Sequence, residues 1–288
     1  MKIIKTIVFA DGQNDGNPCP VVFGSDNLKT EELQAITKGF GVETVFLSKP
    51  SVNGADFRFR YFVPNHEMEM CVHATVGAVT VLVLEKILKK SPVHIQTALG
   101  IINVNWKYVT NNDILVTVEQ FSPRFYGRNP SKILVAEALG INSKMIDNSY
   151  YPIQSVSTSR PKLIIPLIDE ISLHNLVPDF EKLWTLCDEF ETTGFYPFCL
   201  KTEDKDYDFE ARQFPKRVGY NEDPATGVAA CALGAYLTFY SKKKNKILNF
   251  TIGQGKALGK PSKIFVKTIR DKEDIIKTRV GGFAKIVQ

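Results

Sequence analysis

Two runs of this chain are apolar on every side of a helix, and they restrict the folds that the chain can adopt. The runs extend from Ala74 to Leu84 and from Ala225 to Tyr240, and neither contains a charged side chain. A helix without a polar face must be buried all round. The first run is rich in Val, which strands also favour, but its length and its small residues favour a helix. We therefore predict two buried helices, one in each half of the chain.

The starts of the two runs resemble each other. His73-Ala74-Thr75-Val76-Gly77-Ala78 is echoed by Pro224-Ala225-Thr226-Gly227-Val228-Ala229. The first N–H groups of a helix lack partners within the helix, and the positive end of its dipole attracts anions. Two similar halves whose buried helices start at one place could share one anion. The echo therefore points to an enzyme that acts on a small carboxylate.

Length and charge set outer limits on the fold and its partners. The 288 residues are enough for two domains of ordinary size. The 36 Lys and Arg exceed the 31 Asp and Glu, which gives a net charge of +5. Part of this excess lies in the run from Lys242 to Lys246, which has no interleaved aromatic residues. We read that run as a solvated turn and expect no nucleic-acid binding.

Cysteine usage and hydropathy indicate the compartment. The five cysteines are scattered, odd in number and without a C-x-x-C pair, so reduced thiols are expected. No apolar stretch reaches the roughly 18 residues of a membrane span. The first twelve residues become polar too early for a signal peptide. We expect a cytoplasmic protein without membrane contact.

Around the two apolar runs the chain reads mainly as short strands, which predicts an α+β fold. A helix is expected from Thr30 to Gly41, and a polar segment containing Pro123, Gly127 and Pro130 marks a domain boundary. The predicted domains are residues 1–119 and 120–288, and the last strand could cross back to the first domain. Expected strands lie at 2–9, 44–47, 57–63, 93–96, 101–106, 114–118, 163–167, 195–200, 207–213, 247–252, 263–269 and 279–287.

The segment Glu222-Asp223-Pro224-Ala225-Thr226-Gly227 is the sharpest local motif. Asp is a favoured helix cap and Pro a favoured first helical residue, so Asp223 is predicted to cap the second buried helix. Gly227 lacks a Cβ, so a ligand could approach the N–H groups of the first turn. The two interpretations are compatible.

The first buried helix has no comparable cap, because Val72 stands where the echo places Asp223. Its first N–H groups would face water, another segment or a ligand. His73 lies in the first turn, where the positive helix end lowers the pKa of an imidazole and favours its neutral form. His73 is therefore either a proton relay or a packed core histidine.

Cys71 lies two residues before His73 and is either an activated thiol or an ordinary buried hydrophobe. With His66 these two residues lack a fourth ligand at finger-like spacing, so no metal site is expected. The glycines from Gly253 to Gly259 fit neither a dinucleotide fingerprint nor a Walker loop. We expect no cofactor.

Glu43 has the features of a general base. Its neighbours Phe40, Val42, Val45 and Phe46 are apolar, so an inward-facing carboxylate would be desolvated. Desolvation raises the pKa of a carboxyl toward neutrality, where proton transfer is efficient. An outward-facing Glu43 would be an ordinary glutamate at a strand edge.

Taken together, six segments in this order resemble PhzF-like proteins, the phenazine-biosynthesis isomerase and its relatives. These segments are Asp15–Pro18, Glu43–Phe46, Cys71–Thr75, Ser157–Pro161, Glu222–Gly227 and Gln254–Ser262. The resemblance implies the diaminopimelate epimerase fold, with two pseudo-symmetric domains that each wrap a curved, mainly antiparallel sheet around a central helix. It also implies an active site in the cleft between them, cofactor-independent proton transfer at carbon, and a homodimer.

The family's glutamate, histidine and aspartate fall on Glu43, His73 and Asp223, which we predict as the catalytic residues. Substrate-binding residues are expected at the two helix starts: Cys71, Val72, Ala74, Thr75, Thr226, Gly227 and Val228. The family commonly has glycine at the position of Val72 and serine at that of Val228. Both valines would narrow the pocket, which argues against the phenazine-pathway substrate.

The leading hypothesis is an isomerase that moves a proton within a small carboxylate substrate. A racemase or epimerase needs two opposed bases, and diaminopimelate epimerase uses a cysteine pair. Cys71 could be one member, but Cys231 lies more than a turn inside the second helix. A non-catalytic binding protein on the same scaffold is the third hypothesis, and Val72 and Val228 are its support.

Overall fold

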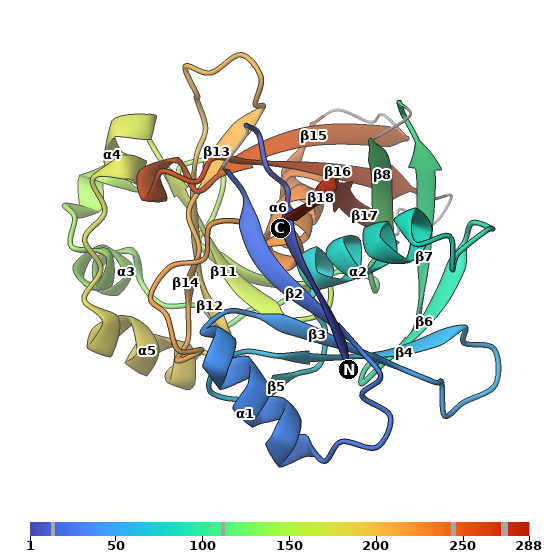
Figure 1. Cartoon of the computed structure of the whole chain (residues 1–288). Coiled ribbons are helices and arrows are strands. Elements are labelled where there is room, and N and C mark those ends of the chain that lie inside the picture. Colours follow the sequence, from blue (N-terminus) through green and yellow to red (C-terminus); the bar gives the residue numbers. More distant parts are fainter. Residues whose placement is uncertain (13–14, 111–112, 243–245, 272–275, 288) are drawn as a thin grey trace.

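Two buried helices lie at the centres of the two halves of the chain, as the apolar runs predict (Figure 1). They are α2 (Val72–Leu84) and α6 (Gly227–Tyr240), and all but the last residues of each are buried. The computed structural model describes residues 1–12, 15–110, 113–242, 246–271 and 276–287. The centre of the basic run (243–245) lies outside these residues.

Strands surround both helices. The first half contains β1 (Lys2–Val8), β2 (Asn17–Phe23), α1 (Thr30–Phe40), β3 (Thr44–Ser48), β4 (Phe57–Phe62), β5 (Glu67–Met68), β6 (Val93–Thr97), β7 (Gly100–Tyr108) and β8 (Ile114–Glu119). The second half contains β9 (Arg124–Phe125), α3 (Lys132–Leu139), β10 (Gln154–Ser157), β11 (Pro161–Leu167), α4 (Glu170–His174), α5 (Phe180–Glu189), β12 (Gly194–Cys199), β13 (Phe209–Ala211), β14 (Phe214–Pro215), β15 (Ile247–Gln254), β16 (Ser262–Arg270), β17 (Ile276–Gly282) and β18 (Ala284–Val287). Two 3₁₀ turns lie at Ser143–Met145 and Lys256–Leu258.

Most strand pairs are antiparallel, as predicted, and the parallel pairs are distributed evenly. The first half has the parallel pairs β2–β3 and β4–β6, and the second half has β11–β12 and β13–β15. Helix α2 packs against β1, β2 and β8, whereas α6 packs against β10, β11, β15, β16 and β17. The predicted α+β class, with a curved sheet around one central helix in each half, is confirmed.

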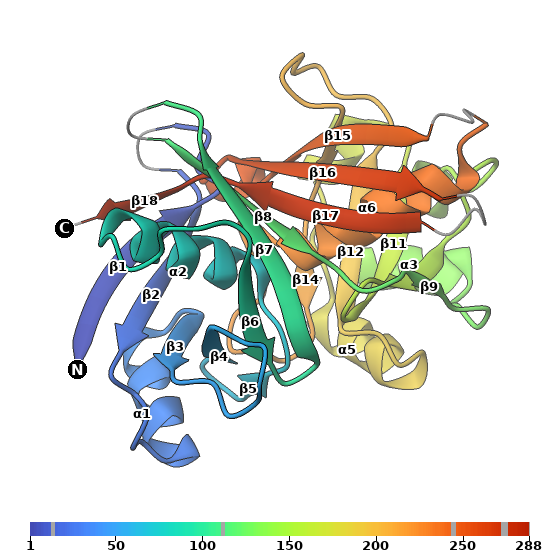
Figure 2. The ribbon, with the colours of Figure 1, turned by 90° about the vertical axis from the view of Figure 1, so that its right-hand side faces the viewer.

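The last strands join the two halves. Strand β17 pairs with β16 on one side and with β8 on the other, and β18 pairs with β1. Figure 2 shows β15, β16 and β17 side by side above α6, while β18 returns toward the N-terminal strand. Gly281 permits the β17–β8 pairing, because a Cβ there would lie 2.1 Å from the carbonyl oxygen of Val116. Strand β18 therefore lies beside the first half of the chain, and the domain boundary after residue 119 stays a prediction.

Helix α1 determines where the chain enters β3. The helix begins at Thr30, but its cap is Lys29, whose N–H donates to the Glu32 carboxylate at 2.7 Å. It ends at Gly41, which adopts the left-handed conformation with a φ of 69°. This turn places Glu43 directly before the first residue of β3, on the side facing the second half.

Among the described residues, none of the helices combines the length and apolarity required to cross a membrane.

Candidate active site

The starts of α2 and α6 are in direct contact. A Cβ on Gly227 would lie 2.5 Å from Cγ1 of Val72, so the Val72 side chain already fills the space above this glycine. At Gly227 the missing Cβ therefore makes room for the neighbouring helix. That it also admits a ligand stays a prediction.

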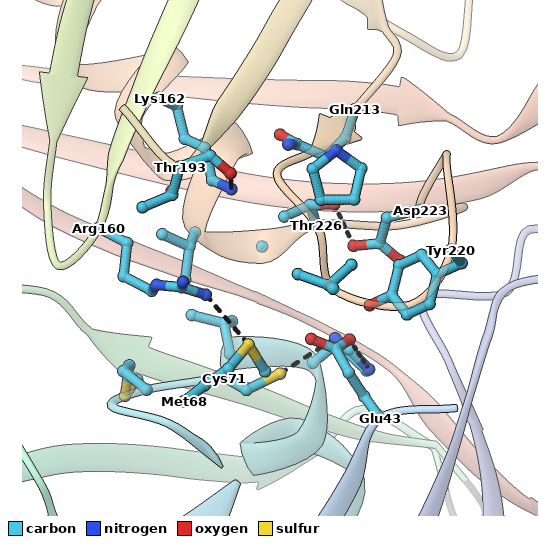
Figure 3. Close-up of a pocket in the computed structure, with 17 residues that line it drawn as sticks. Glu43, Met68, Cys71, Arg160, Lys162, Thr193, Gln213, Tyr220, Asp223 and Thr226 are labelled. Atoms are coloured by element: carbon cyan, nitrogen blue, oxygen red, sulfur yellow. Dashed lines mark hydrogen bonds and ion pairs between the residues drawn. The ribbon is translucent and has the colours of Figure 1, made fainter. Parts of the chain in front are cut away.

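A small cavity lies beside this contact and is lined from both halves of the chain (Figure 3). Its free volume is about 40 Å³, which is room for a few water molecules. The first half contributes Glu43, Met68, Met70, Cys71, Val72 and His73. The second half contributes Arg160, Lys162, Thr193, Gln213, Pro215, Val218, Tyr220, Asp223, Thr226, Gly227 and Val228.

Glu43 and His73 form an ion pair at the floor of this cavity. The Glu43 carboxylate comes from the loop before β3, and the imidazole comes from the first turn of α2. Their Oε2 and Nε2 atoms lie 3.0 Å apart, and both side chains are buried. Cys71 lies on the opposite side of the ring, with its Sγ 3.2 Å from Nδ1 of His73. Glu43 therefore faces inward, as a general base requires.

The charge states of Glu43 and His73 both differ from those that the sequence predicted. Burial raises the pKa of Glu43, but the nearby charges of His73, Arg160 and Lys162 outweigh burial and hold that pKa below its usual value. Burial lowers the pKa of His73, but Cys71 and Glu43 outweigh it and raise that pKa well above 6.5. The predictions of a raised Glu43 pKa and a neutral His73 were wrong, because each rested on local sequence and neither included the partner.

Asp223 lines the same cavity but, unlike Glu43, favours its protonated form. Burial, followed by the negative charge of Glu43, raises the pKa of Asp223 to about 7. Its Oδ1 accepts a hydrogen bond from Nδ2 of Asn17 at 2.5 Å, and its Oδ2 accepts one from the hydroxyl of Thr226. Asn17 belongs to the first half, so this contact ties the aspartate to both halves.

Asp223 does not cap α6, contrary to the prediction. The helix begins at Gly227 and its cap position is Thr226, whose N–H donates to Gln254 at 3.2 Å. The reason is that Asp223 is held in an extended bridge, where its N–H donates to the carbonyl of Gln213 at 3.0 Å. The carboxyl therefore contacts the hydroxyl of the cap residue Thr226 and borders the cavity.

Five of the seven predicted substrate-binding residues line the cavity, namely Cys71, Val72, Thr226, Gly227 and Val228. Ala74 and Thr75 do not line it and are fully buried against the sheet. The hydroxyl of Thr75 lies 2.8 Å from that of Tyr61 and donates to the Cys71 carbonyl. Only the first residues of each helix reach the cavity, because the following ones turn toward the core.

Five polar lining residues were not predicted: Arg160, Lys162, Thr193, Gln213 and Tyr220. Arg160 lies within a segment that carried the family resemblance, so a signal for it existed. Lys162 directly precedes the predicted strand 163–167 and belongs to β11 in the structure. Tyr220, with Glu43 and Asp223, also borders a second cavity that opens toward Pro18 and Lys260. Burial raises the pKa of Tyr220 well above 10, so its phenol remains protonated.

Two clusters of the described residues bring three metal-ligating atoms within 4.8 Å of one another. The first is Glu43, Cys71 and His73. Burial raises the pKa of Cys71 to about 12, so its sulfur is held as a thiol, a poor ligand. The second is Glu170, His174 and Glu210, next to the amine of Lys256, which lies 3.0 Å from Glu170.

The fold is that of the epimerase-like class. A probable proline racemase from Agrobacterium radiobacter has the same fold, with a TM-score of 0.67 at 12% identity over 99% of this chain and 92% of that one. More narrowly, the chain belongs to the PhzC-PhzF family of phenazine biosynthesis-like proteins, whose model matches residues 7–288. This finding confirms the resemblance.

Individual relatives agree with this assignment. An uncharacterized isomerase of Clostridium acetobutylicum is 32% identical over 280 residues, which cover 94% of this chain and 91% of that protein. The crystal structure of a PhzF-family phenazine biosynthesis protein from Bacillus anthracis superposes with a TM-score of 0.90 at 29% identity. That match covers 100% of this chain and 98% of the other.

Proposed function

We propose that the protein is a cofactor-independent isomerase that moves a proton between two carbons of a small carboxylate substrate. The observation that carries this proposal is one buried cavity holding two carboxyl groups with opposite charge preferences. The ion pair with His73 keeps Glu43 ionised, whereas burial keeps a proton on Asp223 up to about pH 7. Pairs of groups whose pKa values are pushed apart in this way mark the base and the acid of a site.

The two groups have complementary roles in the reaction. Glu43 takes a proton from one carbon, and the electrons of that C–H bond pass into the conjugated system next to the substrate carboxylate. Asp223 then gives its proton to a second carbon, and the proton on Glu43 returns to Asp223 before the next turnover. His73, which stays charged, stabilises negative charge near Glu43. General acid–base catalysis of this kind contributes roughly 10²–10⁴-fold.

Both helix starts support the binding of a carboxylate. Neither the start of α2 nor that of α6 has a side-chain cap, and both end at the cavity. Helix N-termini favour anions through their N–H groups and dipoles. Arg160 adds a positive charge on the facing wall. The small free volume also excludes most water, which strengthens these interactions.

Solvent exchange provides the test of this function. Small carboxylic acids incubated with the protein in deuterated water should take up deuterium at carbon, which mass spectrometry detects. Acids that bind without any exchange would contradict the proposal and would favour the non-catalytic binding protein.

The second prediction concerns pH. If Asp223 acts as the acid, the exchange rate should fall as the pH rises above about 7, because the carboxyl then loses its proton.

The same group affects stability: a carboxyl with a raised pKa stabilises the fold fully below its unfolded pKa of about 4, and this contribution disappears as the pH rises to 7. Asp223→Asn should therefore abolish exchange and show a smaller loss of unfolding free energy from pH 4 to 7 than the unmodified protein. Equal losses in both proteins would argue against the raised pKa.

Cys71 tests the alternative of a thiol-based racemase, which the 3.2 Å contact with His73 favours. Burial raises the pKa of both Cys71 and Cys231 to about 12, and Cys231 lies fully buried inside α6, away from the cavity. A pair of opposed thiolates is therefore not formed. Cys71→Ala should reduce exchange by less than about 10-fold, because losses of 10²–10⁴-fold follow the removal of an essential acid or base. A larger loss would favour the racemase.

A further inference from the structure

Lys162 is a buried amine with almost no partner. Its side chain, on β11, lines the cavity, and the residue is 4% exposed. Among the described residues, its Nζ contacts the carbonyl of Thr193 at 3.4 Å and lies within 4.0 Å of no carboxylate. An ammonium group has three donors, and a buried charge is normally paired. Two donors of Lys162 therefore face the cavity without an acceptor.

Gln213 is the second unsatisfied group. The residue is fully buried, and neither its Nε2 nor its Oε1 has a hydrogen-bond partner among the described residues. Its backbone carbonyl is fixed by the N–H of Asp223. Figure 3 shows its amide directed toward the Lys162 side of the cavity. Buried side-chain amides are rarely left unpaired, so such a group requires an explanation.

The third polar group on this side, Arg160, is only partly satisfied. Its Nη1 contacts the thioether of Met68 at 3.0 Å, and a thioether is a weak acceptor. Its Nε lies 3.3 Å from Glu69, which is largely exposed. The wall opposite Glu43 is thus rich in donors and poor in acceptors.

We propose that Lys162 and Gln213 bind a second carboxylate of the substrate, so that the substrate is a small dicarboxylic acid. This inference rests on the proposed function. One carboxylate lies at the helix starts, and the other accepts hydrogen bonds from Nζ of Lys162 and Nε2 of Gln213. The negative charge also keeps Lys162 protonated. The small free volume favours a compact carboxylate over a phosphoryl group.

Binding measurements with matched acids test this proposal. Calorimetry at pH 6.5 would compare succinate and glutarate with butyrate and pentanoate, which have the same chain lengths and one carboxylate fewer. A charged hydrogen bond in a buried site corresponds to about 10–100-fold in affinity. We expect the dicarboxylates to bind at least about 10-fold more tightly. In Lys162→Met and Gln213→Leu this preference should fall to about 2-fold. A lack of preference in the unmodified protein, or a preference retained in both variants, would overturn the proposal.

Thermal stability separates a binding role from a structural one. An unpaired buried amine destabilises the fold, so Lys162→Met should raise the melting temperature by about 2–4 °C. Lys263→Met is the control, because Lys263 is paired with Asp11 at 2.9 Å and lies outside the cavity. That variant should lower the melting temperature and leave the preference for dicarboxylates intact. A lower melting temperature for Lys162→Met would mean that Lys162 is structural, which contradicts the proposal.

The two proposals fail in different ways. If dicarboxylates bind preferentially but no acid takes up deuterium, the isomerase function fails and the second carboxylate site stands. If monocarboxylates exchange at carbon and dicarboxylates show no preference, the function stands and the second carboxylate site fails.

Discussion

Replacing Glu43 by glutamine should abolish the uptake of solvent deuterium, with a loss of roughly 10²–10⁴-fold. The amide of glutamine matches the shape of the carboxylate but cannot accept a proton from carbon. The variant also leaves the charged imidazole of His73 without the partner that lies 3.0 Å away in the unmodified protein. The pKa of His73 should then fall, since Glu43 is one of the groups that raise it. Exchange measured by mass spectrometry and His73 titration measured by NMR would check both effects.

Two controls make this result specific. Ligand binding by Glu43→Gln should persist, because the helix starts and Arg160 are unchanged. Glu67→Gln removes a carboxylate from an ion pair with Arg60 in the same half, at 2.6 Å, and Glu67 does not itself line the cavity. That variant should keep full exchange. Exchange by Glu43→Gln at the unmodified rate would eliminate Glu43 as the base.

The central elements of the fold could be predicted because burial has a clear sequence signature. An uncharged, apolar helix of eleven or more residues must be buried. Helices α2 and α6 lie where the two runs predicted them. Short elements are harder to predict. Helix α4 (Glu170–His174) was missed, because five residues span little more than one turn and show no periodicity.

The sequence predicted more of the residues that line the cavity than of their charge states. Glu43, His73 and Asp223 share one cavity, as the family resemblance implied. Their charge states were not predictable, because a pKa depends on neighbours contributed by other parts of the chain. Lys162 and Gln213 illustrate the same limit. Only the fold shows that Gln213 is buried without a side-chain partner and that Lys162 is buried with the Thr193 carbonyl as its hydrogen-bond partner.

The contact between Val72 and Gly227 explains how a valine fits at the start of α2, and it leads to the second large effect that we expect. Gly227→Ala should lower the free energy of unfolding by about 1–3 kcal/mol, because the new methyl group would overlap Val72. Val72→Ala should cost about 2 kcal/mol, because it leaves a cavity in the core. In the double variant the methyl group at 227 no longer meets Cγ1 of Val72, but it still lies 2.7 Å from the Cβ that alanine keeps, so the overlap is relieved in part. The combined loss should therefore be smaller than the sum of the two by about 0.5–3 kcal/mol.

Denaturant titration of the four proteins measures this coupling, and the same helix supplies a matched control. A Cβ on Gly234 would also meet a valine at 2.5 Å, but that residue is Val266 on β16, away from α2. Gly234→Ala should destabilise the protein, and its effect should add to that of Val72→Ala without coupling, because the two sites share no contact. Additive losses for Val72→Ala and Gly227→Ala would mean that the two helix starts do not touch in solution. If Val72→Ala is coupled to Gly227→Ala but not to Gly234→Ala, the Val72 side chain occupies the space that a Cβ at residue 227 would need. The glycine at the start of α6 is then required for the packing of α2 against α6.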